Sequence, residues 1–88
     1  MKFSLGKVVA TPGSLAEMER LNINPAELIG RHVLMDRGAL DAEDHERNQQ
    51  ALVHGDRIFS SFVYQGVKLW VITEWDRSVT TVLLPEEY

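Results

Sequence analysis

The chain contains no cysteine, which excludes disulfide bonds and thiolate metal sites, so ordinary burial must hold the fold together. No apolar stretch approaches the roughly 18 residues that a membrane-spanning helix needs. The first ten residues also lack the apolar block of about 7 to 15 residues that a secretory signal requires. We therefore expect a cytoplasmic protein that contacts no membrane.

Length and charge narrow the possibilities further. At 88 residues there is room for one hydrophobic core, and we expect a single domain over residues 1–88. So small a domain is marginally stable unless a partner covers an apolar face, which leaves a homodimer as one alternative. Acidic residues outnumber basic ones by 13 to 9, and the net charge of −4 argues against broad binding to nucleic acid. This negative net charge favours binding to a basic surface on a partner.

Local signals predict a short strand and two helices in the first 35 residues. Residues 6–11 are strand-like and stop at Pro12, which is typical of an edge strand. Ser14 and Glu17 have the spacing of a capping box, so a short helix is expected from Ser14 to near residue 20. Asn24 followed by Pro25 is the strongest helix start in the chain, and that second helix should end near residue 35.

A third helix is predicted between Asp41, which has the character of an N-cap, and Gly55, which is typical of a helix stop. Its first turns are strongly polar and must face water or a partner. Four acidic residues gather there: Asp41, Glu43, Asp44 and Glu46.

From residue 57 onward the apolar period becomes two, which indicates strands over residues 57–64, 67–74 and 79–84. Gln65 and Gly66 form a two-residue hairpin loop that pairs Tyr64 with Val67. A second turn covers residues 75–78. The expected fold class is thus α+β, with a short N-terminal strand and two to three helices packed on a C-terminal antiparallel β meander of three to four strands.

This pairing makes both faces of the sheet apolar. Ile58, Phe62 and Val71 fall on one face, while Trp70 and Ile72 fall on the other. A sheet of three or four strands with two apolar faces must be covered twice. We expect helices on one face and, on the other, a second copy of the chain or a different protein.

Few residues carry a signal for chemistry. His32 lies on the apolar stripe of the second helix, where desolvation would make its protonation sensitive to its neighbours; the plainer interpretation is a hydrogen-bonded residue at the border of the core. His45 and His54 are not on adjacent helical turns, so no metal site is expected. No phosphate loop, dinucleotide fingerprint or nucleophile elbow occurs, and no cofactor is expected.

The β region holds one dense polar segment, residues 73–81. Arg77 could hold a phosphate or carboxylate there, with Thr73, Thr80 and Thr81 as hydrogen-bond donors. The plainer interpretation is a hairpin whose turn is held by Asp76 and Ser78. Trp75 in the same segment and Trp70 in the strand before it are either core and turn packing or anchors of a protein interface, since tryptophan is enriched at binding hot spots.

Two stretches, residues 31–48 (RHVLMDRGALDAEDHERN) and 70–88 (WVITEWDRSVTTVLLPEEY), resemble a family of small bacterial proteins carried on plasmids and integrated elements. Its members are labelled "plasmid-related protein" or "type I restriction endonuclease subunit M". A methyltransferase activity would need a cofactor-binding glycine loop and a much larger domain, which this chain does not have. The resemblance implies the context of a mobile element and its contest with host defence.

The order of helices followed by a sheet is also similar to the small nuclease fold of barnase-like and RelE-like toxins. That resemblance implies His32 as the catalytic base, with Arg77 and Thr80 or Thr81 holding the scissile phosphate. Such ribonucleases are usually basic and gain affinity from phosphates, whereas this chain is acidic.

Two hypotheses follow. The first is a non-enzymatic binding protein of a mobile element, meeting a protein partner such as a host defence complex, as an anti-CRISPR or antirestriction factor would. Its contact residues would be Asp41, Glu43, Asp44, Glu46 and Trp75. The alternative is the small ribonuclease centred on His32 and Arg77.

Overall fold

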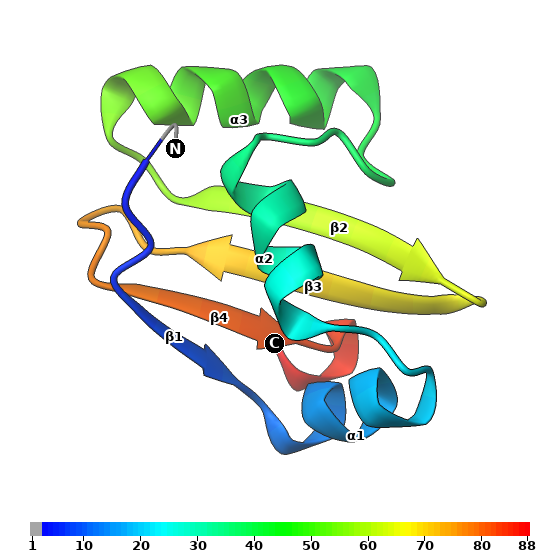
Figure 1. Cartoon of the computed structure of the whole chain (residues 1–88). Coiled ribbons are helices and arrows are strands. Elements are labelled where there is room, and N and C mark those ends of the chain that lie inside the picture. Colours follow the sequence, from blue (N-terminus) through cyan, green and yellow to red (C-terminus); the bar gives the residue numbers. More distant parts are fainter. Residues whose placement is uncertain (1–2) are drawn as a thin grey trace.

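The computed structural model describes residues 3–88. Their elements follow in the order β1 (Lys7–Ala10), α1 (Pro12–Arg20), α2 (Pro25–Val33), α3 (Ala42–His54), β2 (Ile58–Tyr64), β3 (Val67–Thr73), β4 (Val79–Leu83) and the short 3₁₀ helix η1 (Pro85–Glu87). The fold is α+β, as the sequence predicts (Figure 1). Within the described residues, no helix is long and apolar enough to cross a bilayer.

The C-terminal strands form the expected antiparallel meander. Tyr64 pairs with Val67 across a turn in which both Gln65 and Gly66 have positive φ, and Thr73 pairs with Thr80. Because strand side chains alternate between faces, this register confirms the two apolar faces. We call the face that holds Ile58, Phe62 and Val71 the first face, and the face that holds Trp70 and Ile72 the second face.

The prediction of a purely antiparallel sheet is wrong in one respect. The strand order is β1-β4-β3-β2, and the edge strand β1 runs parallel to β4, so the sheet is mixed. β1 extends the sheet at the free edge of β4, because α3 lies along the other outer strand, β2 (Figure 1). Gly6 allows the close approach: its φ is +63°, and a Cβ there would overlap the backbone carbonyl groups of Arg77 and Ser78.

Helix starts follow local chemistry, with one correction. Asn24 and Asp41 cap α2 and α3 as predicted, and Gly55 ends α3 in the left-handed conformation. The capping box at Ser14 does not form. α1 instead begins at Pro12, with the Thr11 hydroxyl accepting a hydrogen bond from the Ser14 amide, because proline at N1 loses no helical hydrogen bond.

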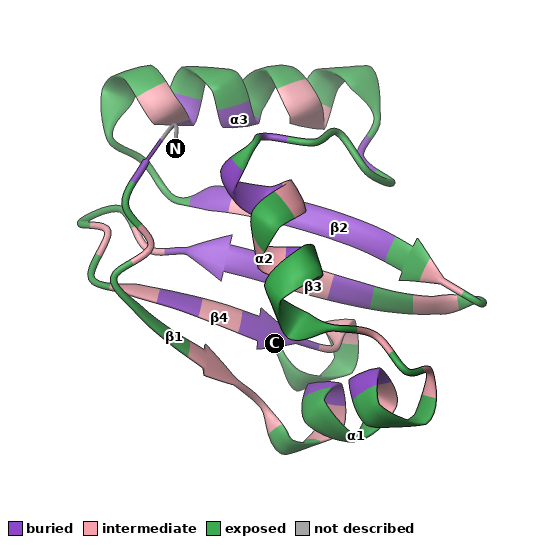
Figure 2. Cartoon of the chain, in the orientation of Figure 1, coloured by how far each residue is buried: buried purple, intermediate pink, exposed green. Residues whose placement is uncertain are grey.

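The core lies between the first face and the helices. Met18 of α1 and Leu28 of α2 pack there against Phe62, Leu69 and Val71, all at most 2% exposed. Figure 2 shows that burial concentrates on β2 and β3, whereas most of α3 is exposed. The helices therefore cover the first face, as the apolar pattern predicts.

The second face is covered differently. η1 follows β4 and turns back behind the sheet (Figure 1). The Tyr88 ring meets Trp70 edge to face, with 5.9 Å between the ring centroids. Glu87 anchors this tail by accepting hydrogen bonds from the Thr11 hydroxyl and from the amides of Gly13 and Leu84. The tail leaves part of the second face open.

Candidate partner-binding site

An aromatic recess of about 460 Å³ opens on the second face, between α3 and Tyr88. Phe59, Trp70 and Ile72 form its floor. Phe59 stands opposite Ile72 in the β2–β3 register, and its ring meets Trp70 edge to face at 4.9 Å. The lining is mainly apolar, and the volume falls within the range of about 300–1,000 Å³ that is typical of ligand sites.

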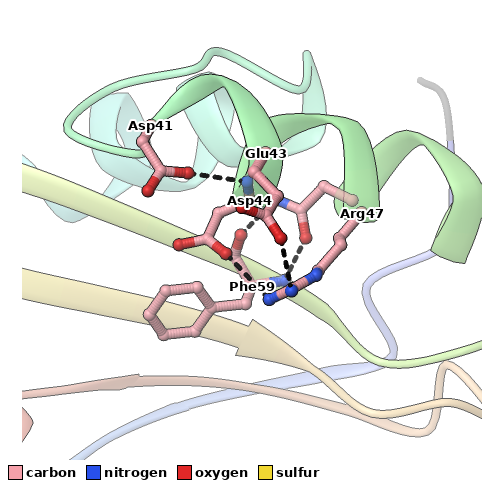
Figure 3. Close-up of polar contacts among 6 residues, drawn as sticks. Asp41, Glu43, Asp44, Arg47 and Phe59 are labelled. Atoms are coloured by element: carbon pink, nitrogen blue, oxygen red, sulfur yellow. Dashed lines mark hydrogen bonds and ion pairs between the residues drawn. The ribbon is translucent and has the colours of Figure 1, made fainter.

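One wall of the aromatic recess comes from α3. Asn48 holds this helix on the sheet edge: its amide group donates to the carbonyl oxygen of Phe59, and its Oδ1 accepts from the Phe59 amide at 2.9 Å. Asp44 and Arg47 stand on the same side of α3 beside Phe59 (Figure 3). An asparagine that pairs with the free edge of β2 thus fixes where the charged wall lies over the aromatic floor.

The opposite wall is formed by Arg57 and Tyr88. The Arg57 guanidinium donates to the Tyr88 hydroxyl at 2.7 Å and to the Glu74 carboxylate at 3.2 Å. These hydrogen bonds raise the pKa of Arg57 above its ordinary value, Tyr88 contributing most, so Arg57 stays charged. The aromatic recess therefore offers an apolar floor with a fixed cation and a phenol at its rim.

Tyr88 also lines a smaller recess of about 220 Å³. The smaller recess extends over Thr81 and Leu83 toward Glu87, and the two recesses share Arg57, Ile72 and Tyr88. Tyr88 is 73% exposed and forms part of the border of both. The second face thus carries one interrupted groove and not two unrelated hollows.

His32 lies on the first face and is fully buried. Its Nδ1 is 2.7 Å from the Ser60 hydroxyl, and its Nε2 is 2.8 Å from the Thr73 hydroxyl. Burial lowers the pKa of His32 to about 4, because the charged imidazolium would lose its hydration. At neutral pH the ring is neutral and sealed from solvent.

The hydroxyl groups around His32 fix its tautomer. Thr80 donates to the carbonyl oxygen of Leu5 at 2.7 Å, so its own oxygen must accept from Thr73, 2.7 Å away. Thr73 has then used its only proton and accepts from Nε2–H of His32, which leaves Nδ1 to accept from Ser60. Within residues 3–88 each buried side-chain nitrogen and oxygen has a hydrogen-bond partner, so the hydrogen bonds of His32 are all satisfied inside the core.

Arg77 is committed to the backbone. Its guanidinium donates to the carbonyl oxygens of Asp56, Glu74 and Ala51, and so joins the β3–β4 turn to the C-terminal end of α3. Asp76 and Ser78 hold that turn by hydrogen bonds, as predicted. The Phe3 ring packs edge to face with the His32 ring, with 5.2 Å between the two centroids. The Cζ atom of Arg77 lies 5.8 Å from the centroid of the Phe3 ring.

The two threonines named for the ribonuclease hypothesis point to opposite faces. Thr80 is buried beside His32, whereas Thr81 is half-buried on the second face and lines the smaller recess. The structure therefore does not bring His32, Arg77, Thr80 and Thr81 together around a common open space. Among residues 3–88, no group of three or more histidine and carboxylate side chains could hold a metal ion.

The residues predicted to contact a partner form two separate groups. Asp41, Glu43, Asp44 and Glu46 lie at the N-terminal end of α3, whereas Trp75, 67% exposed, lies in the β3–β4 turn near the other end of that helix (Figure 1). Arg47 pairs with both Glu43, at 2.8 Å, and Asp44, at 3.2 Å, which reduces the negative field (Figure 3). Of all five residues, only Asp44 lines the aromatic recess.

Sequence reasoning missed Phe59, Arg57 and Tyr88 as site residues. Phe59 was within reach, because the same alternation that puts Trp70 and Ile72 on the second face puts Phe59 there too. Nothing in the local sequence indicates that Tyr88 would fold back onto Trp70. Comparison with protein-family models, curated proteins and solved structures found no match to this chain.

Proposed function

We propose that this chain is a non-enzymatic protein-binding factor whose contact surface is the aromatic recess. The observation that carries the proposal is the recess itself: two aromatic rings and an isoleucine lie at the bottom of an open hollow, ringed by charged side chains. Binding hot spots have this composition, an aromatic anchor region surrounded by polar groups.

The partner surface we propose is apolar at its centre and carries basic groups on the side that faces the N-terminal end of α3. The chain has a net charge of −4, and the exposed carboxylates of Asp41, which caps α3, and of Glu46 on α3 belong to the helix that forms one wall of the recess. Charges of opposite sign around an apolar contact speed association and fix its orientation. The resemblance to small proteins of plasmids and integrated elements suggests a host defence complex as the source of this partner.

The chain offers a matched pair of variants for testing this surface. Trp70→Ala removes the recess floor, whereas Trp75→Ala removes an exposed indole that does not line the recess. The partner is first captured from extracts of cells that carry restriction-modification and CRISPR systems, and its binding is then measured with purified proteins. We expect Trp70→Ala to weaken binding at least tenfold and Trp75→Ala to leave it within about twofold.

Charge is tested with variants that spare the fold. Asp41→Asn keeps the helix cap, and Glu46→Lys reverses a charge without disturbing the Arg47 ion pairs. Together they should slow association and reduce its dependence on salt. Unchanged binding in Trp70→Ala, or loss in Trp75→Ala alone, would show that the contact surface lies elsewhere.

A second copy of the chain is the alternative occupant. Light scattering over a concentration series separates it from a foreign partner, and we expect a monomer. A dimer that Trp70→Ala dissociates would assign the aromatic recess to self-association.

A further inference from the structure

Tyr88 gives direct information about what the aromatic recess accepts. Its ring packs edge to face on Trp70, and its hydroxyl receives a hydrogen bond from Arg57 at 2.7 Å. An aromatic ring and a fixed polar handle are thus already recognised at this site, by residues of the same chain. The contact with Trp70 buries apolar area, and the hydrogen bond from Arg57 fixes one polar group. Small binding sites gain their specificity from these two kinds of contact.

Tyr88 is also poorly held. It is 73% exposed, and the two contacts described for its side chain, Trp70 and Arg57, both belong to the recess. The firm anchor of the tail is the preceding residue, Glu87, whose carboxylate bonds the start of α1 and the Leu84 amide. The Tyr88 side chain can therefore swing away while η1 stays in place.

We propose that Tyr88 occupies the position of an aromatic side chain of the partner, and that binding exchanges one for the other. This proposal rests on the proposed function. The partner would present an exposed tyrosine, whose ring would lie on Trp70 and whose hydroxyl would accept from Arg57. Once Tyr88 moves aside, the aromatic and smaller recesses join into one groove that can hold the chain on either side of that tyrosine.

Competition sets the sign of the expected effects. A ligand that must displace Tyr88 binds only during the fraction of time that the site is free. Its apparent Kd is therefore the intrinsic Kd divided by that fraction. Tyr88→Ala should therefore tighten binding, although it removes a residue of the site. A recess that merely used Tyr88 as a wall would show the opposite change, weaker binding. The two explanations thus predict shifts of opposite direction.

The probes are N-acetyl-L-tyrosinamide, N-acetyl-L-phenylalaninamide and N-acetyl-L-leucinamide. They are titrated into the isotopically labelled full chain and followed by NMR at the indole N–H of Trp70, with that of Trp75 as internal reference. We expect saturable shifts at Trp70 alone, with affinity falling from tyrosine to phenylalanine to leucine. Tyr88→Ala should lower the Kd for the tyrosine amide about three- to tenfold.

A second variant tests the polar handle. Arg57→Gln should abolish the preference for the tyrosine amide over the phenylalanine amide while retaining the preference of both over the leucine amide.

An unshifted Trp70 resonance, or an unchanged or higher Kd in Tyr88→Ala, would overturn the exchange. If the amides behave as expected but no protein partner binds, the proposed function fails while this inference stands. If a partner binds and Tyr88→Ala does not tighten it, the inference alone fails.

Discussion

His32 illustrates how tertiary context decides the role of a residue. An imidazole on an apolar helix stripe is compatible with catalysis and with a place in the core, and the sequence leaves both open. In the fold it is fully buried and bonded on both ring nitrogens, to Ser60 and Thr73. The partners come from β2 and β3, 28 and 41 residues away along the chain, so no local pattern could reveal them.

This burial predicts a pH dependence of stability. The pKa of His32 is lowered to about 4 in the folded state, whereas an unfolded histidine has a pKa of about 6.5. The unfolded chain therefore binds the proton first, and the free energy of unfolding should fall by roughly 2 kcal/mol as the pH drops from 7 to 4.5. Urea unfolding at a series of pH values measures this slope.

Two variants separate His32 from the other titrating groups. His32→Gln should flatten the slope between pH 6.5 and 4.5, because glutamine does not titrate. His54→Gln, which replaces an exposed histidine, should retain the slope. An imidazole resonance of His32 that titrates near pH 6.5 by NMR would contradict the buried, neutral ring.

At the scale of elements, the short-range predictions are confirmed except for the capping box at Ser14, because α1 begins at Pro12 with Thr11 as its cap. Asn24 and Asp41 cap their helices, Gly55 ends α3, and Gln65-Gly66 sets the register of β2 and β3. Each of these features depends on residues a few positions apart, which is why the sequence reveals them. The direction of β1 does not depend on nearby residues. Its partner β4 lies about 70 residues away, and the composition of β1 was compatible with either direction.

Docking of β1 against β4 depends on Gly6. Alanine there would combine an unfavourable positive φ with overlap between its Cβ and two backbone carbonyl groups, which cannot move aside cheaply. Gly6→Ala should lower the free energy of unfolding by more than about 3 kcal/mol. Gly66→Ala is the matched control: its φ is +81° but no atom lies within 4 Å, so a loss of about 1 to 2 kcal/mol is expected. Equal losses in urea unfolding would show that the close approach to β4 carries no weight.

At the scale of the whole molecule, the two faces of the sheet have different roles. The first face is covered by α1 and α2 and, at Ile58, by Ala51 of α3. It carries the core and the hydrogen bonds of His32. The second face has only α3 at one edge and η1 with Tyr88 at the other, and it keeps the aromatic recess open. An interaction surface is therefore expected on the second face.

The same division leads to a prediction about RNA. The four residues of the ribonuclease hypothesis are spread over the core, a turn and the second face, so we expect purified protein to leave labelled RNA intact. Cleavage that both His32→Ala and Arg77→Ala abolish would contradict this expectation. Cleavage that neither variant changes would identify a contaminating nuclease.

The sequence by itself determined the α+β class, the caps of α2 and α3, the hairpin register and the presence of two apolar faces, because these depend on spacing within a few residues. Only the tertiary structure decided that β1 joins β4 in parallel, that His32 is sealed, and that Tyr88 returns to Trp70. Those outcomes depend on contacts between segments that are far apart in the sequence. Such contacts form only when the chain folds around one core, so no local pattern specifies them.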